Sequence, residues 1–164
     1  MKKILNIALI AHDTRKQELY DWVKFNAKSL YPHNLYATGT TGKLLKDITI
    51  DEIEETCIQD GTTFYNNLNL TIHTVLSGPL GGDAEIACMI AKGHIDILVF
   101  FCDNLSMQPH NADIQGLSRL ASLYNIAFAT NRTTADMILT SPLFANPCYT
   151  PINPDFSDYL NRKI

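Results

Sequence analysis

Five short apolar runs recur along this chain, and the longer segments between them carry apolar residues at helical spacing. The run IDILVFF at 95–101 is nearly continuous, which is typical of a strand buried on both faces of a parallel sheet. Strands that alternate with helices predict an α/β fold, here a single-domain, three-layer, doubly wound sheet that is mainly parallel. The runs that predict strands are residues 4–11, 34–38, 70–76, 95–101 and 126–130.

Helices are predicted between these strands, and some of their ends carry clear signals. Gly93 is expected to close one helix, because glycine adopts the left-handed conformation that ends many helices. Thr133 or Thr134 is expected to cap another. Cys88 and Cys102 lie in apolar surroundings and are interpreted as small core residues. The predicted helices are residues 14–30, 40–46, 83–92, 112–124 and 133–139, with a last turn at 156–164.

The length of 164 residues suits one domain, so we expect residues 1–164 to form a single unit. One stretch, residues 47–66, breaks the alternation of strands and helices and is rich in Asp and Glu. Because these carboxylates would be costly to bury, we interpret the stretch as an acidic surface insertion with a short helix at 50–58.

Charge and composition argue against several classes of protein. The formal net charge is −4 and no basic stripe is present, so binding to nucleic acid or to an anionic membrane has no electrostatic support. No apolar run approaches the roughly 18 residues of a membrane span, and the N-terminal run lacks a cleavage pattern, so a cytoplasmic location is expected. The four cysteines and five histidines show no metal-ligand spacing.

Polar segments follow the predicted strands at the points where the strands end. Because ligands of open α/β sheets bind outside the carboxyl ends of the strands, we expect these segments to form one site. Four such segments stand out: His12-Asp13 with Lys16, Thr38–Gly42, Ser77–Asp83, and Asp103 with His110.

The residue types in these segments suit a phosphate group. Thr38–Gly42 supplies hydroxyls and helix-start amides, and Lys16 could reach the same rim, so anion binding is favoured over a simple capped turn. Ser77–Asp83 holds three glycines, but by itself it is better explained as a tight turn with Asp83 as a helix N-cap. Loop histidines such as His12 and His110 are, taken singly, more often structural than catalytic.

Asp103 is harder to explain as a structural residue, because a carboxylate at the end of the most apolar strand is costly unless it is solvated or paired. Taken together, the segments suggest proton abstraction beside a carbonyl on a small phosphate ester. One carboxylate would act as the base and a histidine would polarise the carbonyl.

The same segments resemble one known family, methylglyoxal synthase. The motifs that carry the resemblance are ALIAHDTRKQEL, LYATGTTGKL, LSGPLGGDAEI, GHIDILVFFCDNLSMQPHNADIQGL and RLASLYNIAFATNRTTADMIL, which run from residue 7 to about residue 144. Their order and nearly their spacing are those of the family. The combination of TGTTG, SGPLGGD and the stretch from Phe100 to Asp113 is specific to it.

The resemblance implies conversion of dihydroxyacetone phosphate to methylglyoxal and inorganic phosphate, without a metal or an organic cofactor. It implies that Asp83 is the catalytic base, that His110 contacts the carbonyl end of the substrate, and that Asp13, Asp103 and Asp113 line or support the site. The residues implied to bind substrate and phosphate are His12, Lys16, Thr38, Gly39, Thr40, Thr41, Ser77, Gly78 and His110.

The resemblance also implies a homohexamer, inhibition by phosphate and cooperativity. In the family a basic residue near the C-terminus serves neighbouring subunits, and both Arg162 and Lys163 are candidates for it. The segment between Gly42 and Ser77 is longer than the family pattern, and residues 47–66 hold the excess. All the matched site residues lie outside that insertion.

Two alternatives to this enzyme remain open on the sequence. A regulatory module with the same fold would need the anion site but not Asp83, Asp103 and His110 together, so their joint presence favours an enzyme. An activity like that of triosephosphate isomerase would share the enediolate intermediate but would not expel phosphate.

Overall fold

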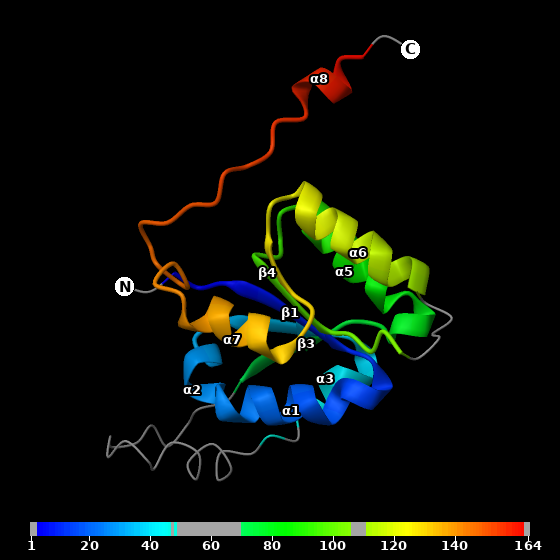
Figure 1. Cartoon of the computed structure of the whole chain (residues 1–164), viewed down its shortest axis with the longest axis vertical. Helices are drawn as coiled ribbons and strands as arrows, with labels where there is room; N and C mark the ends of the chain where they lie inside the picture. The colour runs from blue at the N-terminus through cyan, green and yellow to red at the C-terminus, as the bar shows by residue number, and fades with distance from the viewer. Residues whose placement is uncertain (1–2, 47, 49–69, 106–110, 163–164) are drawn as a thin grey trace.

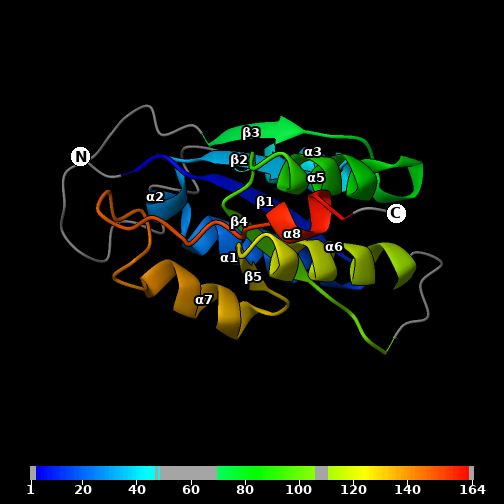
Figure 2. The ribbon, with the colours of Figure 1, turned by 90° about the horizontal axis from the view of Figure 1, so that it is seen from above.

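The computed structural model describes residues 3–46, 48, 70–105 and 111–162. Within them, five parallel strands form one sheet in the order β3-β2-β1-β4-β5 (Figures 1 and 2). The predicted α/β fold with a parallel sheet is therefore confirmed, and each strand is slightly shorter than its apolar run. The strands are β1 (Asn6–Ala11), β2 (Asn34–Ala37), β3 (Thr71–Thr74), β4 (Ile97–Phe101) and β5 (Ala127–Ala129).

Helices cover both faces of the sheet, giving three layers (Figures 1 and 2). On one face lie α1 (Lys16–Phe25), α2 (Ala27–Leu30), α3 (Gly39–Lys46) and α7 (Arg132–Thr140), whose buried residues share one apolar cluster. On the other face α5 (Gly82–Ala91) packs beside α6 (Asn111–Leu123). A C-terminal segment leads away from these layers to the short helix α8 (Ser157–Leu160) (Figure 1).

The central strands β1 and β4 explain why two layers of helices are needed. In β1, Ile7 and Leu9 point into the cluster beneath α1, whereas Ala8 and Ile10 point into the cluster beneath α5 and α6. All five residues of β4 are buried. Burial of these strands on both faces explains why their apolar runs in the sequence are nearly continuous.

The strand order reverses between β1 and β4. From β1 the chain moves outward to β2 and β3, then returns to the other side of β1 to form β4. The register pairs Ala11 with Phe101, so both strands end at the same level. In open parallel sheets, a crevice outside the carboxyl ends of the strands at such a reversal is where ligands bind.

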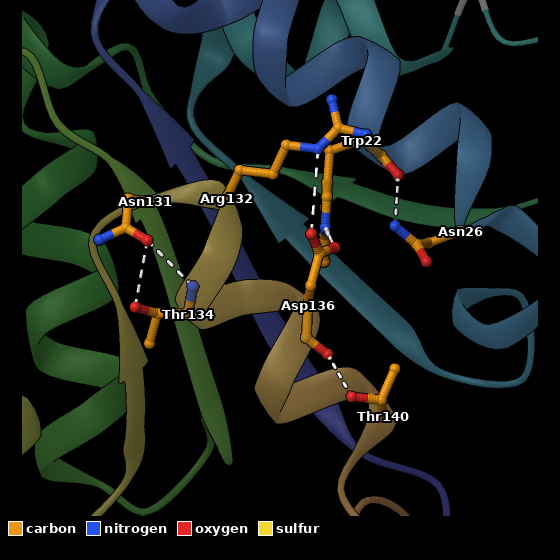
Figure 3. Close-up of polar contacts among 7 residues, drawn as sticks. All are labelled: Trp22, Asn26, Asn131, Arg132, Thr134, Asp136 and Thr140. Carbon is orange, nitrogen blue, oxygen red and sulfur yellow. Dashed lines mark hydrogen bonds and ion pairs between the residues drawn. The ribbon is translucent and has the colours of Figure 1, made fainter.

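One polar contact ties two helices of the first layer together (Figure 3). Trp22 of α1 is only 1 % exposed, and its indole N–H donates to Asp136 Oδ1 of α7 at 2.7 Å. Arg132 lies 4.0 Å from the other oxygen of the same carboxylate. A buried indole needs an acceptor for its N–H, and Asp136 supplies it from the solvent side.

Three local predictions are wrong. The single helix predicted at 14–30 is a 3-10 turn, η1 (Asp13–Arg15), followed by α1 and α2, which meet at Asn26. The cap of α7 is Asn131, whose side chain accepts the Thr134 N–H, so the capping position lies two residues before Thr133. Cys88 is exposed, because the buried side of α5 is formed by Ile86 and Ile90.

The helices predicted at 40–46, 83–92, 112–124 and 133–139 are confirmed within one residue at each end, and Gly93 has the expected positive φ of 71°. The last turn predicted at 156–164 is shorter, since α8 ends at Leu160. The predicted insertion at 47–66, with its helix at 50–58, lies outside the described residues except for Ile48. Within the part of the chain that is described, no helix is long and apolar enough to cross a membrane.

Cys88 and Cys102 differ in burial, and the rate of thiol alkylation can measure this difference. Burial raises the pKa of the Cys102 thiol to about 11, whereas Cys88 is exposed. Because the thiolate is the reactive form, we expect iodoacetamide at pH 8 to alkylate Cys102 at least about 10²-fold more slowly than Cys88. Peptide mapping by mass spectrometry measures both rates, and full denaturation should make them similar. Equal rates in the native protein would contradict the described burial.

Candidate active site

A cavity of about 160 Å³ opens at the carboxyl ends of the strands. Its walls come from the segments after β1, β2 and β3, and its floor includes Phe100 of β4. Three of the four segments that the sequence groups into one site therefore line one cavity, whereas Asp103 of the fourth does not line it. The predicted site residues that line this cavity are His12, Asp13, Lys16, Thr38, Thr40, Gly78 and Asp83.

Lys16 joins two walls of the cavity. Its Nζ donates to Asp13 Oδ1 in the segment after β1 and, at 2.7 Å, to Thr40 Oγ1 in the segment after β2. The hydrogen bond and charge of Lys16 hold the pKa of the Asp13 carboxyl below its usual range. Because the Asp13 side chain is 86 % exposed, it lies on the rim, where it orients the ammonium group.

The segments after β2 and β3 touch each other directly. The Gly39 N–H donates to the Leu76 carbonyl at 3.1 Å, and a Cβ at position 39 would lie 2.6 Å from Ser77 Oγ. Any side chain at position 39 would therefore push the two segments apart. Thr38 and Thr41, both buried, lie within 3.4 Å of each other through their hydroxyls at the start of α3.

A tight turn places Asp83. The 3-10 turn η3 (Gly78–Leu80) leads into Gly81, which has a φ of 102°, and Gly82 then donates its N–H to the Ser77 carbonyl. A Cβ at position 82 would lie 1.9 Å from the Leu76 carbonyl oxygen, so only glycine fits there.

Asp83 lies in the first turn of α5, is 9 % exposed and lines the cavity. The interpretation of Asp83 as an N-cap is wrong, since Gly81 occupies that position and no side chain caps the helix. A Cβ at position 78 would lie 2.9 Å from Asp83 Oδ2, which shows how closely the carboxylate faces the glycine turn. The helix start favours negative charge on this buried carboxylate.

His12 lines the cavity and has one ring nitrogen without a partner among the described residues. Its Nδ1 accepts the Asp103 N–H at 2.7 Å, and its ring packs edge-on against Phe100 with centroids 5.1 Å apart. Its Nε2 is buried and has no hydrogen-bond partner among the described residues. Because buried polar atoms are nearly always paired, this nitrogen is a position where a ligand oxygen would bind.

Asp103 supports His12 and does not itself line the cavity. Its carboxylate is held at both oxygens, by the Thr14 hydroxyl at 2.7 Å and by the Leu105 N–H at 3.0 Å. Sequence reasoning missed Thr14 and Phe100. Thr14 lies inside the motif ALIAHDTRKQEL, but nothing in that motif shows which residue the hydroxyl contacts.

The remaining predicted residues are not all placed. His110 lies outside the described residues, as does the side chain of Asp113. Lys163 is also outside them, and Arg162 stacks on the ring of Tyr159, 3.8 Å from its centroid. Within the described ranges, no group of three or more His, Cys, Asp or Glu side chains could hold a metal ion.

The arrangement as a whole combines donors for an anion with a base. Lys16, Thr38 and Thr40 line the cavity and offer an ammonium group and hydroxyls beside the start of α3, and the buried residue Asp83 lines it from the glycine turn. Such a site can hold a small phosphate ester and remove a proton from it.

Comparisons with known proteins agree on one family. The sequence model of the MGS-like domain matches residues 18–130. A methylglyoxal synthase of Maridesulfovibrio salexigens is 43 % identical over 164 residues, covering all of both chains. One from Leptospira interrogans is 46 % identical over 141 residues, covering 86 % of this chain and 82 % of its own. The crystal structure of methylglyoxal synthase from Elizabethkingia anophelis superposes with a TM-score of 0.80 at 39 % identity, covering 100 % and 95 % of the two chains.

The turn before Asp83 allows a paired test of local geometry. We expect Gly82→Ala to lower the melting temperature and to weaken phosphate binding, because its Cβ would strike the Leu76 carbonyl. The control Gly116→Ala, in the middle of α6 with nothing within 4 Å, should raise stability by about 0.5–1 kcal/mol. Calorimetry of both variants measures the difference. A Gly82→Ala protein as stable as the parent would show that the turn is not sterically closed.

Proposed function

The chain belongs to the methylglyoxal synthase family, and we propose that it acts as a carbon–oxygen lyase on dihydroxyacetone phosphate, releasing methylglyoxal and inorganic phosphate. One observation carries the residue assignments: the buried carboxylate of Asp83 lines the same cavity as Lys16 and Thr40. A base and an anion site within one small cavity are what proton abstraction from a phosphate ester requires.

The phosphate group binds between the segments after β1, β2 and β3. An ammonium group has three donors, and Lys16 uses two of them on Asp13 and Thr40, so one remains for a phosphate oxygen. Thr38, Thr40, Thr41 and the N–H groups at the start of α3 supply further donors, and Ser77 and Gly78 face them across the Gly39 contact. These donors also stabilise the charge that gathers on the leaving phosphate.

Asp83 is the base in this proposal. Its carboxylate takes a proton from carbon 3 of the substrate, and the electron pair of that bond forms the enediolate with the carbonyl at carbon 2. Its position in the first turn of α5 and against the glycine turn fixes the carboxylate before substrate arrives. A fixed base close to the reacting carbon lowers the entropic part of the barrier.

Elimination then completes the reaction. The carbon 3 oxygen becomes the aldehyde oxygen, a double bond forms between carbons 2 and 1, and the bond from carbon 1 to the phosphate oxygen breaks. The enol that results takes up a proton at carbon 1 to become methylglyoxal. Overall the proton from the carbon 3 hydroxyl is transferred to the phosphate, so no oxidant, reductant or cofactor is consumed.

Other residues act on the substrate oxygens or on the groups that hold them. His12 binds a substrate oxygen through Nε2, which is buried without another described partner. Asp103 orients His12, and Asp13 orients Lys16. Four points are proposed on the family resemblance alone: His110 as the electrophile at the carbonyl, Asp113 beside it, the homohexamer and inhibition by phosphate. The cytoplasmic location stays a prediction from the sequence.

Measurement of both products from one incubation tests this function. With dihydroxyacetone phosphate as substrate, methylglyoxal and inorganic phosphate should appear in equal amounts. An isomerase would instead give glyceraldehyde 3-phosphate without phosphate release. A regulatory module would bind the substrate and release neither product.

The role of Asp83 has a direct test. We expect Asp83→Asn to lower kcat by about 10²–10⁴-fold, the usual contribution of a general base, with little change in the affinity for inorganic phosphate. Asp96→Asn is the control, because Asp96 lies at the amino ends of the strands, away from the cavity, where its carboxylate accepts the Asn6 N–H. Steady-state kinetics and calorimetric phosphate titration on both variants separate catalysis from binding. A turnover near that of the parent in Asp83→Asn would exclude Asp83 as the base.

A further inference from the structure

A chain of contacts beside the cavity connects a residue without an assigned role to His12. We propose that Thr14 is a positioning residue: its hydroxyl holds Asp103 so that the Asp103 N–H keeps His12 in the form with its proton on Nε2. This inference rests on the proposed function for its catalytic consequence. The orientation of His12 itself can be measured separately.

The first link is the tautomer of His12. A backbone N–H can only donate, so Nδ1, which accepts the Asp103 N–H at 2.7 Å, must offer a lone pair. In the neutral ring the proton then lies on Nε2. That atom is buried and without a described partner, so the ring presents a hydrogen-bond donor to a ligand.

The second link is the pair of hydrogen bonds that the Asp103 carboxylate accepts. Its Oδ2 accepts the Thr14 hydroxyl at 2.7 Å, and its Oδ1 accepts the Leu105 N–H at 3.0 Å. The Leu105 contact is local, two residues along the chain. Thr14 is 89 residues away in sequence, and its hydrogen bond ties Asp103 to the segment that directly follows β1 and His12.

The third link is the place of Thr14 in the fold. It lies in η1, which begins directly after His12 and is closed by the Arg15 N–H donating to the His12 carbonyl at 2.8 Å. The His12 N–H in turn donates to the Phe101 carbonyl of the neighbouring strand β4 at 3.2 Å. His12, Thr14 and Asp103 thus form a closed ring of contacts across the ends of β1 and β4.

This ring matters for the reaction because the substrate and its enediolate offer oxygen atoms. A donor on Nε2 stabilises negative charge on such an oxygen, whereas a lone pair on Nε2 would repel it. Without the Thr14 hydroxyl, Asp103 can shift and its N–H can leave Nδ1. The other tautomer of His12 then becomes accessible, and the donor to the substrate is lost from part of the population.

Substitutions at Thr14 isolate the hydroxyl. Thr14→Val keeps the shape of the side chain and removes the donor, and Thr14→Ser restores the donor. We expect Thr14→Val to lower kcat by between about 10-fold and 10²-fold, the size of effect that a misplaced catalytic group produces, and Thr14→Ser to recover most of it. The affinity for inorganic phosphate should not change, because the Lys16 and Thr40 contacts remain.

The matched control is Thr140→Val, which removes a hydroxyl that donates to the backbone carbonyl oxygen of Asp136 in α7 at 2.8 Å. Its kcat should equal that of the parent. A second readout is the tautomer of His12, from 15N NMR of histidine-labelled protein, with the signal assigned by its loss in His12→Gln. The parent should show the proton on Nε2, and Thr14→Val should show a mixture of the two forms.

The outcomes separate the two proposals. If the parent releases no methylglyoxal, the proposed function fails, and the NMR comparison alone decides whether Thr14 orients His12. If the parent is active, three results would each overturn the role of Thr14: an unchanged kcat in Thr14→Val, no recovery in Thr14→Ser, or an unchanged His12 tautomer in Thr14→Val.

Discussion

The pairing of β1 with β4 is the constraint on which the rest of the site depends. Ala11 lies opposite Phe101, so the two buried strands end together and His12 comes within hydrogen-bond distance of the Asp103 N–H. A shift of one residue in this register would turn each side chain of β1 to the other face of the sheet. The apolar clusters on both faces oppose such a shift, so the stability of the core also fixes the geometry of His12.

The site also requires that the backbone segments after β2 and β3 approach each other closely. The segment after β2 and the segment after β3 are in contact at Gly39 and Ser77, and Gly82 lies so near the Leu76 carbonyl that no side chain fits. These contacts bring the donors of α3 and the carboxylate of Asp83 to one cavity. Gly39 and Gly82 are therefore needed because backbone segments approach each other closely at these positions. Gly81 is needed for its left-handed backbone conformation.

The sequence predicted the elements that depend on strong periodic patterns and missed details set by single contacts. Continuous apolar runs identified β1 and β4, because a strand that is buried on both faces carries apolar residues at successive positions. The break at Asn26 could not be predicted, because it depends on the Asn26 side chain bonding to the Trp22 carbonyl. The contact of Thr14 with Asp103 joins residues that are 89 positions apart, and no local pattern encodes such a distance.

The central claim is that the segments after β1, β2 and β3 form one phosphate site. Hydrogen–deuterium exchange measured with and without inorganic phosphate tests it most directly, because the backbone N–H groups are part of the proposed site. We expect phosphate to slow exchange in peptides that cover Thr38–Gly42 and Ser77–Asp83 together, and to leave peptides of α7 unchanged. Protection in only one of the two segments, or protection confined to another part of the chain, would contradict a single shared site.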